Sequence, residues 1–242
     1  MDNVFAHPTA IVDGARIGAG TRVWAFAHLL PGARLGANCN VADHVFIEGG
    51  AVIGNNVTLK NNVCVWDGTT IDDDVFIGPN VTFTNDRYPR SPRMPQMHER
   101  YACPENWLSP THVGRGCTIG ANATILPGVQ LGAYSFIAAG AVVIGDVASF
   151  ALVVGSPGRV IGDVCCCGRR LDGSHAAAVC AFCGETPVQR MLRRGHDRTP
   201  AGQPAPANGN AFLAQTAVTR SPGELLEKDI VMLAHASRTG GA

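Results

Sequence analysis

One spacing dominates the chain: an aliphatic or aromatic residue recurs at every sixth position from Ile11 to Phe83, and again in the same phase from Val113 to Val143. A period of six is neither the helical period nor the two-residue alternation of a β-strand. It is typical of a parallel β-helix, in which each six-residue turn adds one short strand to the wall. Glycine often follows the aliphatic position, as tight corners with positive φ require. The sequence therefore predicts an all-β solenoid built from hexapeptide turns.

The composition agrees with a narrow solenoid and excludes several function classes. Aromatic residues make up 6% of the 242 residues, whereas glycine occurs 29 times. The formal net charge is zero, which is not the basic balance of a nucleic-acid-binding domain. No apolar run reaches the roughly 18 residues of a membrane-spanning helix. The first residues lack the pattern of a signal peptide, so we expect a cytoplasmic protein whose nine cysteines are thiols or metal ligands rather than disulfides.

The pattern divides the chain into three segments. Residues 1–163 form the solenoid domain, interrupted by an excursion over residues 86–112 that is rich in Pro, Arg and aromatic residues. Long excursions within a compact repeat are usually functional. The last part of this domain, residues 148–163, loses the hexad and is expected to leave the solenoid. Residues 164–186 resemble a zinc ribbon in their cysteine pattern, and residues 187–242 have the composition of a largely disordered tail.

Two cysteine pairs, each followed by glycine, come directly after the solenoid. Cys165 with Cys167, and Cys180 with Cys183, are spaced as two knuckles of a structural zinc site with four thiolate ligands. Cys166 is an alternative member of the first pair, and a tail of free thiols is the alternative to a metal site. Four thiolates leave no open coordination position, so a catalytic zinc is excluded here.

Positions eighteen residues apart fall on adjacent coils of a three-sided solenoid, about 4.8 Å apart, so neighbours across coils follow from the numbering. Asp67 and Asn85 share a column at the corner where the excursion leaves, and Glu48 and Trp66 share the next column. His44 falls in a column of asparagines at a different corner. Asparagines at corners also form simple turn ladders. The polar cluster beside a loop rich in Arg, Tyr and Trp is the best candidate for an active site.

Six segments of the chain together resemble one family: HPTAIVDGARIG, WAFAHLLPGA, DHVFIE, FIGPNVTFTNDRYPR, IGANATILPGV and ALVVGSPGRVIG. They resemble the left-handed β-helix N-acetyltransferases of UDP- or dTDP-linked 3-amino-3-deoxyhexoses, which serve surface polysaccharide synthesis. The resemblance covers residues 5–163, and FTNDRYPR is its most specific part. It implies a left-handed single-stranded β-helix, a homotrimer with active sites between neighbouring chains, and acetyl-CoA and a nucleotide sugar as the two substrates.

The resemblance also implies roles for individual residues. Asn85 would hold the C3 amine of the sugar, Glu48 or Asp67 would bind a sugar hydroxyl, and His44 is the fallback base. The remaining candidates for substrate binding are the aromatic and basic residues near these columns and at the start of the excursion: His28, Trp24, Trp66, Arg87, Tyr88 and Arg90. The expected coenzyme A contacts lie in the C-terminal coils: Ala138, Ala139, Gly140, Gly155, Pro157 and Arg159.

The choice of acceptor depends on histidine. The excursion contains His98 and His112, and the sequence gives neither an evident Asp or Glu partner. A hydroxyl acceptor typically needs a base, whereas an amine that is already neutral can rely on position. We therefore expect N-acetylation, with O-acetylation of a sugar or serine as the alternative. A metal site of the γ-carbonic anhydrase type would need three converging histidines, and the FTNDRYPR and SPGR segments argue against an inactive trimeric scaffold.

Overall fold

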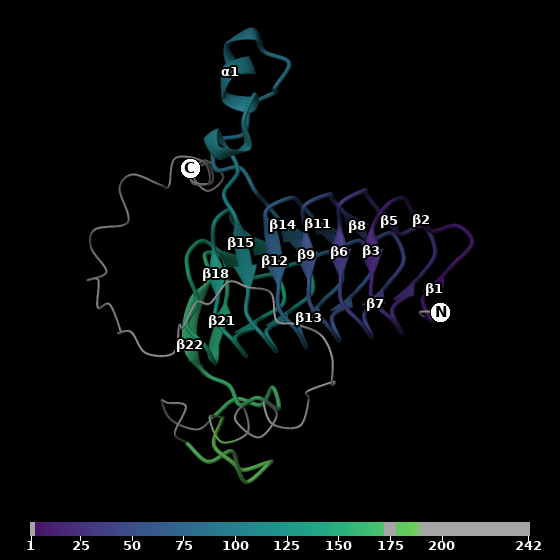
Figure 1. Ribbon diagram of the computed structural model, residues 1–242. Coiled ribbons are helices and arrows are strands. Elements are labelled where there is room, and N and C mark those ends of the chain that lie inside the picture. The colour runs from purple at the N-terminus through teal and green to yellow at the C-terminus, as the bar shows by residue number, and fades with distance from the viewer. Residues whose placement is uncertain (1–2, 172–177, 188, 190–242) are drawn as a thin grey trace, which may run out of the picture. The chain divides into compact units, whose positions relative to one another are not determined.

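The computed structural model describes residues 3–171, 178–187 and 189, all within the compact unit that ends at Arg198. The part up to Asp163 is a three-sided parallel β-solenoid (Figure 1), which confirms the predicted fold class. Left-handed coiling stays a prediction. The predicted disordered tail lies almost wholly outside the described residues. None of the helices in the described part of the chain is long and apolar enough to cross a membrane.

Three sheets form the walls, and each of the first six coils contributes one strand to each sheet. Sheet A runs in the order β1 (Phe5–Ala6), β4 (Arg22–Val23), β7 (Asn40–Val41), β10 (Thr58–Leu59), β13 (Phe76–Ile77), β16 (Thr118–Ile119), β19 (Phe136–Ile137), β21 (Ala151–Val154), β22 (Arg159–Asp163). Sheet B runs β2 (Ile11–Val12), β5 (His28–Leu29), β8 (Phe46–Ile47), β11 (Cys64–Val65), β14 (Thr82–Phe83), β17 (Thr124–Ile125), β20 (Val142–Val143). Sheet C runs β3 (Arg16–Ile17), β6 (Arg34–Leu35), β9 (Val52–Ile53), β12 (Thr69–Ile71), β15 (Thr111–Val113), β18 (Gln130–Leu131).

The register between coils follows the predicted eighteen-residue spacing. Val41 pairs with Leu59, for example, and Ile47 pairs with Val65. Across the excursion the spacing rises to 42 residues, as in the pair Ile77 and Ile119. The difference, 42 − 18 = 24, is the number of inserted residues. The coils on either side of the excursion therefore stack as if it were absent.

The core is a set of aliphatic columns inside the solenoid. Phe83 heads the fully buried side chains by size, followed by leucines and isoleucines of the hexad positions. Burying each such side chain stabilises the fold by about 1.5–3 kcal/mol relative to exposure. Left-handed corners connect the strands, and asparagine occupies many of them, such as Asn62 (φ +63°) and Asn80 (φ +58°). The Nδ2 atom of Asn62 donates to Asn80 Oδ1 at 3.0 Å, so the expected asparagine ladder is present.

Two predicted boundaries are wrong by small steps at the ends of the solenoid. In the first coil Val12, not Ile11, aligns with Leu29; Ile11 is 48% exposed and Val12 packs on the core. At the other end, β21 pairs in parallel with β19 and so stays in the solenoid instead of leaving it. Both differences arise because these end coils have fewer than eighteen residues, which shifts the phase of the pattern.

The excursion leaves sheet B after β14 and returns to sheet C at β15. It carries the short helices η1 (Pro95–Met97), α1 (His98–Tyr101) and η2 (Pro104–Asn106). It ends at residue 110 rather than at 112, because Thr111 and His112 pair with Thr69 and Thr70 of β12. Figure 1 shows it projecting from the corner between sheets B and C.

Candidate active site

Three polar residues meet where the excursion departs. The backbone N–H of Asp67 donates to Glu48 Oε2 at 2.9 Å, and Asn85 Nδ2 donates to the Asp67 carbonyl oxygen at 3.2 Å. Asp67 Oδ1 accepts from the N–H of Gly68 at 2.7 Å. The predicted neighbour relation between Asp67 and Asn85 is therefore confirmed, and Glu48 joins them from the preceding coil.

This corner presents unused acceptor oxygens. Asn85 Oδ1, Glu48 Oε1 and Asp67 Oδ2 have no hydrogen-bond partner within the described residues, and all three side chains are partly exposed. Each is an acceptor whose chemistry suits an N–H or O–H donor. A ligand that carries amine and hydroxyl groups is the natural complement of such a corner.

A glycine makes room for the Asp67 carboxylate. Gly50 lies at the same corner one coil earlier, with φ +90°, and a Cβ atom there would overlap Asp67 Oδ1. Gly32, another coil earlier, has φ +92°, but a Cβ there would meet only ordinary contacts, the nearest at 3.7 Å. The column of glycines thus supplies the left-handed turn, and Gly50 also leaves the space into which Asp67 projects.

Aromatic side chains on the outer face of sheet B lead to this corner. The ring of His28 lies 5.7 Å from that of Phe46 in an edge arrangement, and Phe46 lies 5.6 Å from Trp66. The indole N–H of Trp66 donates to the Phe83 carbonyl oxygen at 2.9 Å, and the ring packs on the core. Trp66 is therefore anchored structurally, and Phe46, which the sequence did not single out, lies between it and His28.

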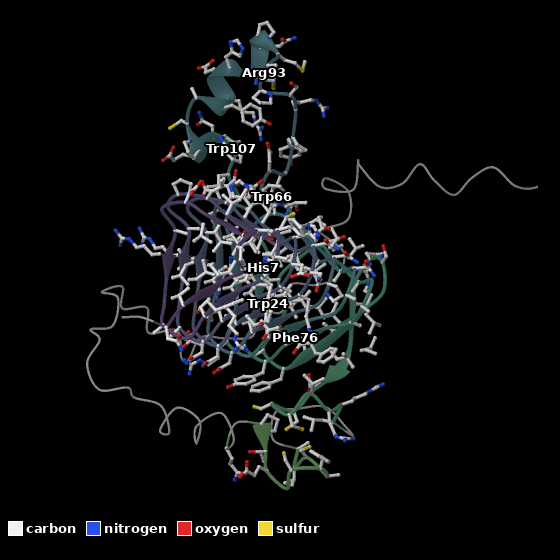
Figure 2. The ribbon with its side chains drawn as sticks, turned by 90° about the vertical axis from the view of Figure 1, so that its right-hand side faces the viewer. His7, Trp24, Trp66, Phe76, Arg93 and Trp107 are labelled. Atoms are coloured by element: carbon white, nitrogen blue, oxygen red, sulfur yellow. The ribbon has the colours of Figure 1, made fainter. Side chains whose placement is uncertain are left out.

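Two predicted site residues lie elsewhere in the chain. His44 is at the corner between sheets A and B, with φ +59°, and stacks on Phe26 with ring centroids 5.1 Å apart. Trp24 follows β4 of sheet A, and its indole N–H donates to Asn40 Oδ1 at 2.8 Å. Figure 2 shows Trp66 at the foot of the excursion and Trp24 away from it. Within one chain the structure does not bring His44 or Trp24 to the Asn85 corner.

The side chain of Asp86, which the sequence did not single out, bonds to Arg100 at the start of the excursion. Asp86 accepts two hydrogen bonds from the Arg100 guanidinium, at 2.6 and 2.8 Å, and the pKa of its carboxyl falls to about 2 because of that partner. Arg87 lies over Gly128, with Nη2 3.1 Å from the position of a Cβ there. Tyr88 is 68% exposed, and Arg90 is exposed too. Asp86 is part of FTNDRYPR, but nothing in the linear sequence indicates Arg100 as its partner.

One expectation about histidine is wrong. His112 does have an acidic partner: its Nε2 lies 3.0 Å from Asp72 Oδ1, on the outer face of sheet C. The hydrogen bond to Asp72 raises the pKa of the imidazole above its ordinary 6.5. The sequence did not indicate this pair because the excursion separates the two residues by 40 positions. His98 begins α1 and shows no such pair.

The six residues predicted to contact coenzyme A gather at the C-terminal end of the solenoid. Ala138 donates its backbone N–H to Val153, and Gly140 occupies the following corner with φ +69°. Gly155, Pro157 and Arg159 form the turn between β21 and β22 and the start of β22, and Ala139 lies between Ala138 and Gly140. Val142 joins this turn to β20, because its N–H donates to the Gly155 oxygen and its oxygen accepts from the Gly158 N–H. A pocket of about 160 Å³ lies beside the turn.

The four predicted cysteines form one cluster. The sulfur atoms of Cys165, Cys167, Cys180 and Cys183 all lie within 4.8 Å of one another, with Cys165 and Cys183 at 3.5 Å and Cys167 and Cys180 at 3.7 Å. Cys166 is outside the cluster, since its thiol faces the Pro187 oxygen. Backbone N–H groups of residues 182 and 183 lower the pKa of the Cys180 thiol to about 6, whereas burial raises that of Cys165 to about 12. The cluster can hold a metal ion.

Comparison with known proteins finds one matching family and one relative that is similar over most of its length. The chain matches the family described as "Bacterial transferase hexapeptide (six repeats)" over residues 14–49, 50–85 and 110–145. It is 46% identical over 184 residues to the dTDP-3-amino-3,6-dideoxy-α-D-galactopyranose 3-N-acetyltransferase of Aneurinibacillus thermoaerophilus, covering 76% of this chain and 90% of that protein.

Two further similarities are more limited. A 2,3,4,5-tetrahydropyridine-2,6-dicarboxylate N-acetyltransferase of Brevibacillus brevis is 52% identical over 52 residues, 22% of each chain. The solved acetyltransferase domain of PglB from Neisseria gonorrhoeae FA1090, in complex with acetyl coenzyme A, gives a TM-score of 0.44 at 20% identity, over 66% of this chain and 58% of that one.

Proposed function

Because the chain belongs to the hexapeptide-repeat β-helix acetyltransferases, we propose that it transfers an acetyl group from acetyl-CoA to the C3 amine of a nucleotide-linked 3-amino-3-deoxyhexose. The observation that carries the proposal is the 46% identity to a dTDP-3-amino-sugar 3-N-acetyltransferase across 90% of that protein. It also favours dTDP over UDP, a choice that the sequence alone left open. The corner of acceptor oxygens at Glu48, Asp67 and Asn85 supports an amine- and hydroxyl-bearing substrate.

The chemistry needs few groups from the protein. The neutral amine nitrogen attacks the thioester carbonyl, and an oxyanion develops on the carbonyl oxygen. When the oxyanion collapses, the carbon–sulfur bond breaks, and the proton lost by the nitrogen is taken up by the leaving thiolate, which gives the amide and free coenzyme A. Asn85 Oδ1 accepts a hydrogen bond from the amine N–H and orients its lone pair, while Glu48 and Asp67 hold sugar hydroxyls. Holding two reactants in attacking geometry supplies a large part of such a rate enhancement. A backbone N–H at a corner of the solenoid would stabilise the oxyanion.

The proposal is tested by measuring coenzyme A release from acetyl-CoA with a panel of dTDP- and UDP-3-amino sugars, with the matched 3-hydroxy sugars as controls. Release with a dTDP-3-amino sugar alone supports the proposal in full. Release only with UDP sugars would correct the nucleotide, and release only with 3-hydroxy sugars would overturn the amine acceptor.

One observation favours a second candidate, acetylation of a hydroxyl group. The His112–Asp72 pair has the composition of a general base with an orienting carboxylate, which a hydroxyl acceptor typically needs. The variant His112→Asn distinguishes the two functions. N-acetylation that relies on Asn85 should keep most of its rate, whereas O-acetylation should fall by about a hundredfold or more.

We also propose that the four-cysteine cluster binds a structural zinc ion. Tetrahedral coordination with Zn–S bonds of about 2.3 Å places the sulfur atoms about 3.8 Å apart, close to the separations of 3.5 and 3.7 Å in two of the pairs. Freshly purified protein should contain about one zinc per chain by elemental analysis, and Cys180→Ser should remove it. Cys166→Ser is the matched control and should keep the metal; zinc-free wild-type protein would refute the site.

Two further expectations, a homotrimer and a cytoplasmic location, remain proposals for this chain. A homotrimer, with the acetyl-CoA groove between neighbouring chains, predicts a solution mass three times that of the chain by light scattering. A monomeric mass in the active protein would exclude it. The cytoplasmic location stays a prediction of the sequence.

A further inference from the structure

Asp86 lies at the base of the excursion, directly after Asn85, and its carboxylate is saturated with donors. Oδ1 accepts from the Tyr88 backbone N–H at 2.8 Å and from Arg100 Nη2 at 2.6 Å. Oδ2 accepts from Arg100 Nη1 and from the Tyr101 hydroxyl, both at 2.8 Å. Only 9% of the side chain is exposed. A carboxylate with this many charge-assisted bonds holds its neighbours in fixed positions.

These bonds join the outgoing arm of the excursion to the returning arm. The outgoing arm is the segment that begins at Asp86. Arg100 and Tyr101 belong to α1, with which the returning arm begins. The Tyr101 oxygen also accepts from the Arg90 backbone N–H at 3.0 Å, and Asp86 bridges Leu108 in antiparallel fashion. One carboxylate therefore sets the backbone of the outgoing arm at two points, directly at residue 88 and through a tyrosine at residue 90.

The side chains displayed on this arm suit a diphosphate. Arg87 and Arg90 form no ion pair within the described residues, whereas the charge of Arg100 is neutralised by Asp86. Tyr88, which lies between the two arginines in the chain, is exposed. Guanidinium groups bind phosphate oxygens in paired, directional contacts, and they do so best when their backbone is fixed in advance.

We propose that Asp86 is a positioning residue for the nucleotide sugar: through Arg100 and Tyr101 it fixes the outgoing arm so that Arg87, Tyr88 and Arg90 meet the diphosphate. This inference rests on the proposed function, because it takes a sugar nucleotide as the substrate. It assigns binding of the nucleotide part to the excursion and binding of the amine to the Asn85 corner.

The solenoid should tolerate a change at Asp86. Register pairs on both sides of the excursion, such as Ile71 with Val113 and Phe83 with Ile125, keep the stacking of uninterrupted coils. Loosening the excursion therefore leaves the core packing in place. This separates a positioning role from a role in folding.

The test compares Asp86→Asn with Glu105→Gln, which neutralises an exposed carboxylate of the same excursion that accepts from the Cys103 thiol and has no ion pair within the described residues. In Asp86→Asn the KM for the nucleotide sugar should rise by about tenfold to a hundredfold, because charge-assisted bonds are lost. The KM for acetyl-CoA and the melting temperature should stay unchanged, Asp86→Glu should recover part of the affinity, and Glu105→Gln should match wild type. An unchanged KM for the sugar, or an equal rise in both KM values, would overturn the inference.

A second readout does not depend on activity. The excursion contains four arginines, Arg87, Arg90, Arg93 and Arg100, at which trypsin can cut. Cleavage there should be at least about tenfold faster in Asp86→Asn than in wild type or Glu105→Gln, since cleavage tracks local opening. Equal cleavage rates would show that Asp86 does not hold the arm. A wild-type chain that acetylates no amino sugar would refute the proposed function instead, so the two failures are distinguishable.

Discussion

The glycine column beside the candidate site allows stability and activity to be separated by a single methyl group. Gly32 and Gly50 occupy equivalent corners one coil apart, with φ +92° and +90°. Alanine at either position must adopt a left-handed backbone, which costs about 1–3 kcal/mol. At Gly32 the new methyl group meets nothing closer than 3.7 Å, whereas at Gly50 it overlaps the Asp67 carboxylate.

The difference between the two variants isolates the position of Asp67. Gly50→Ala should be less stable than Gly32→Ala by about 1–2 kcal/mol, since Asp67 must give up its bond to the Gly68 N–H. For a domain of this size that is about 2–8 °C in melting temperature. The rate should diverge more: kcat/KM should fall by about tenfold to a hundredfold in Gly50→Ala and by less than about threefold in Gly32→Ala.

Thermal unfolding and coenzyme A release, measured on the same preparations, provide both numbers. The double variant Gly50→Ala with Asp67→Ala has neither the overlap nor the bond to the Gly68 N–H, so its stability should stay near that of Gly50→Ala, and its activity should stay low. Equal losses of activity in the two single variants would refute the reasoning, because they would show that the placement of Asp67 does not matter to the reaction.

Three further predictions concern single groups. Asn85→Ala should lower turnover by about a hundredfold while shifting the melting temperature by less than about 2 °C; parallel losses would make Asn85 a turn residue only. Asp72→Asn should lower the pKa of His112, followed by NMR titration, because the raised pKa comes mainly from that carboxylate; the pair stabilises the fold fully below pH about 6.5 and loses this contribution as the pH rises through the raised pKa. The Asp86 carboxyl, with its pKa lowered to about 2, should hold the excursion down to pH about 4 and release it between about 4 and 2, as read from Trp107 fluorescence; release above pH 5 would contradict it.

The six-residue period was enough to predict the walls, the core columns and the neighbours across coils. It placed Asp67 beside Asn85 because both lie in uninterrupted coils, where eighteen residues equal one full rise. It failed at Ile11 because the next residue, Val12, is also aliphatic, and a coil shortened by one residue leaves no mark in the pattern.

Contacts between residues on either side of the excursion, or within it, could not be predicted from the sequence. His112 and Asp72 are coil neighbours in space, but 24 inserted residues hide the spacing. The partners of Asp86 depend on how the excursion folds back on itself, which has no period at all. The direction of the Trp66 indole, toward the Phe83 oxygen, likewise follows from side-chain packing rather than from the position in a column.

The hairpin formed by β21 and β22 affects how the end of the solenoid can associate with other molecules. A stack of parallel strands ends in a row of free backbone donors and acceptors, which can recruit strands from another molecule. Here β22 covers β21 in the antiparallel direction, and the turn between them occupies Val142 of β20. The last strand of sheet A therefore runs against the others, so a second solenoid cannot continue sheet A in the same parallel register.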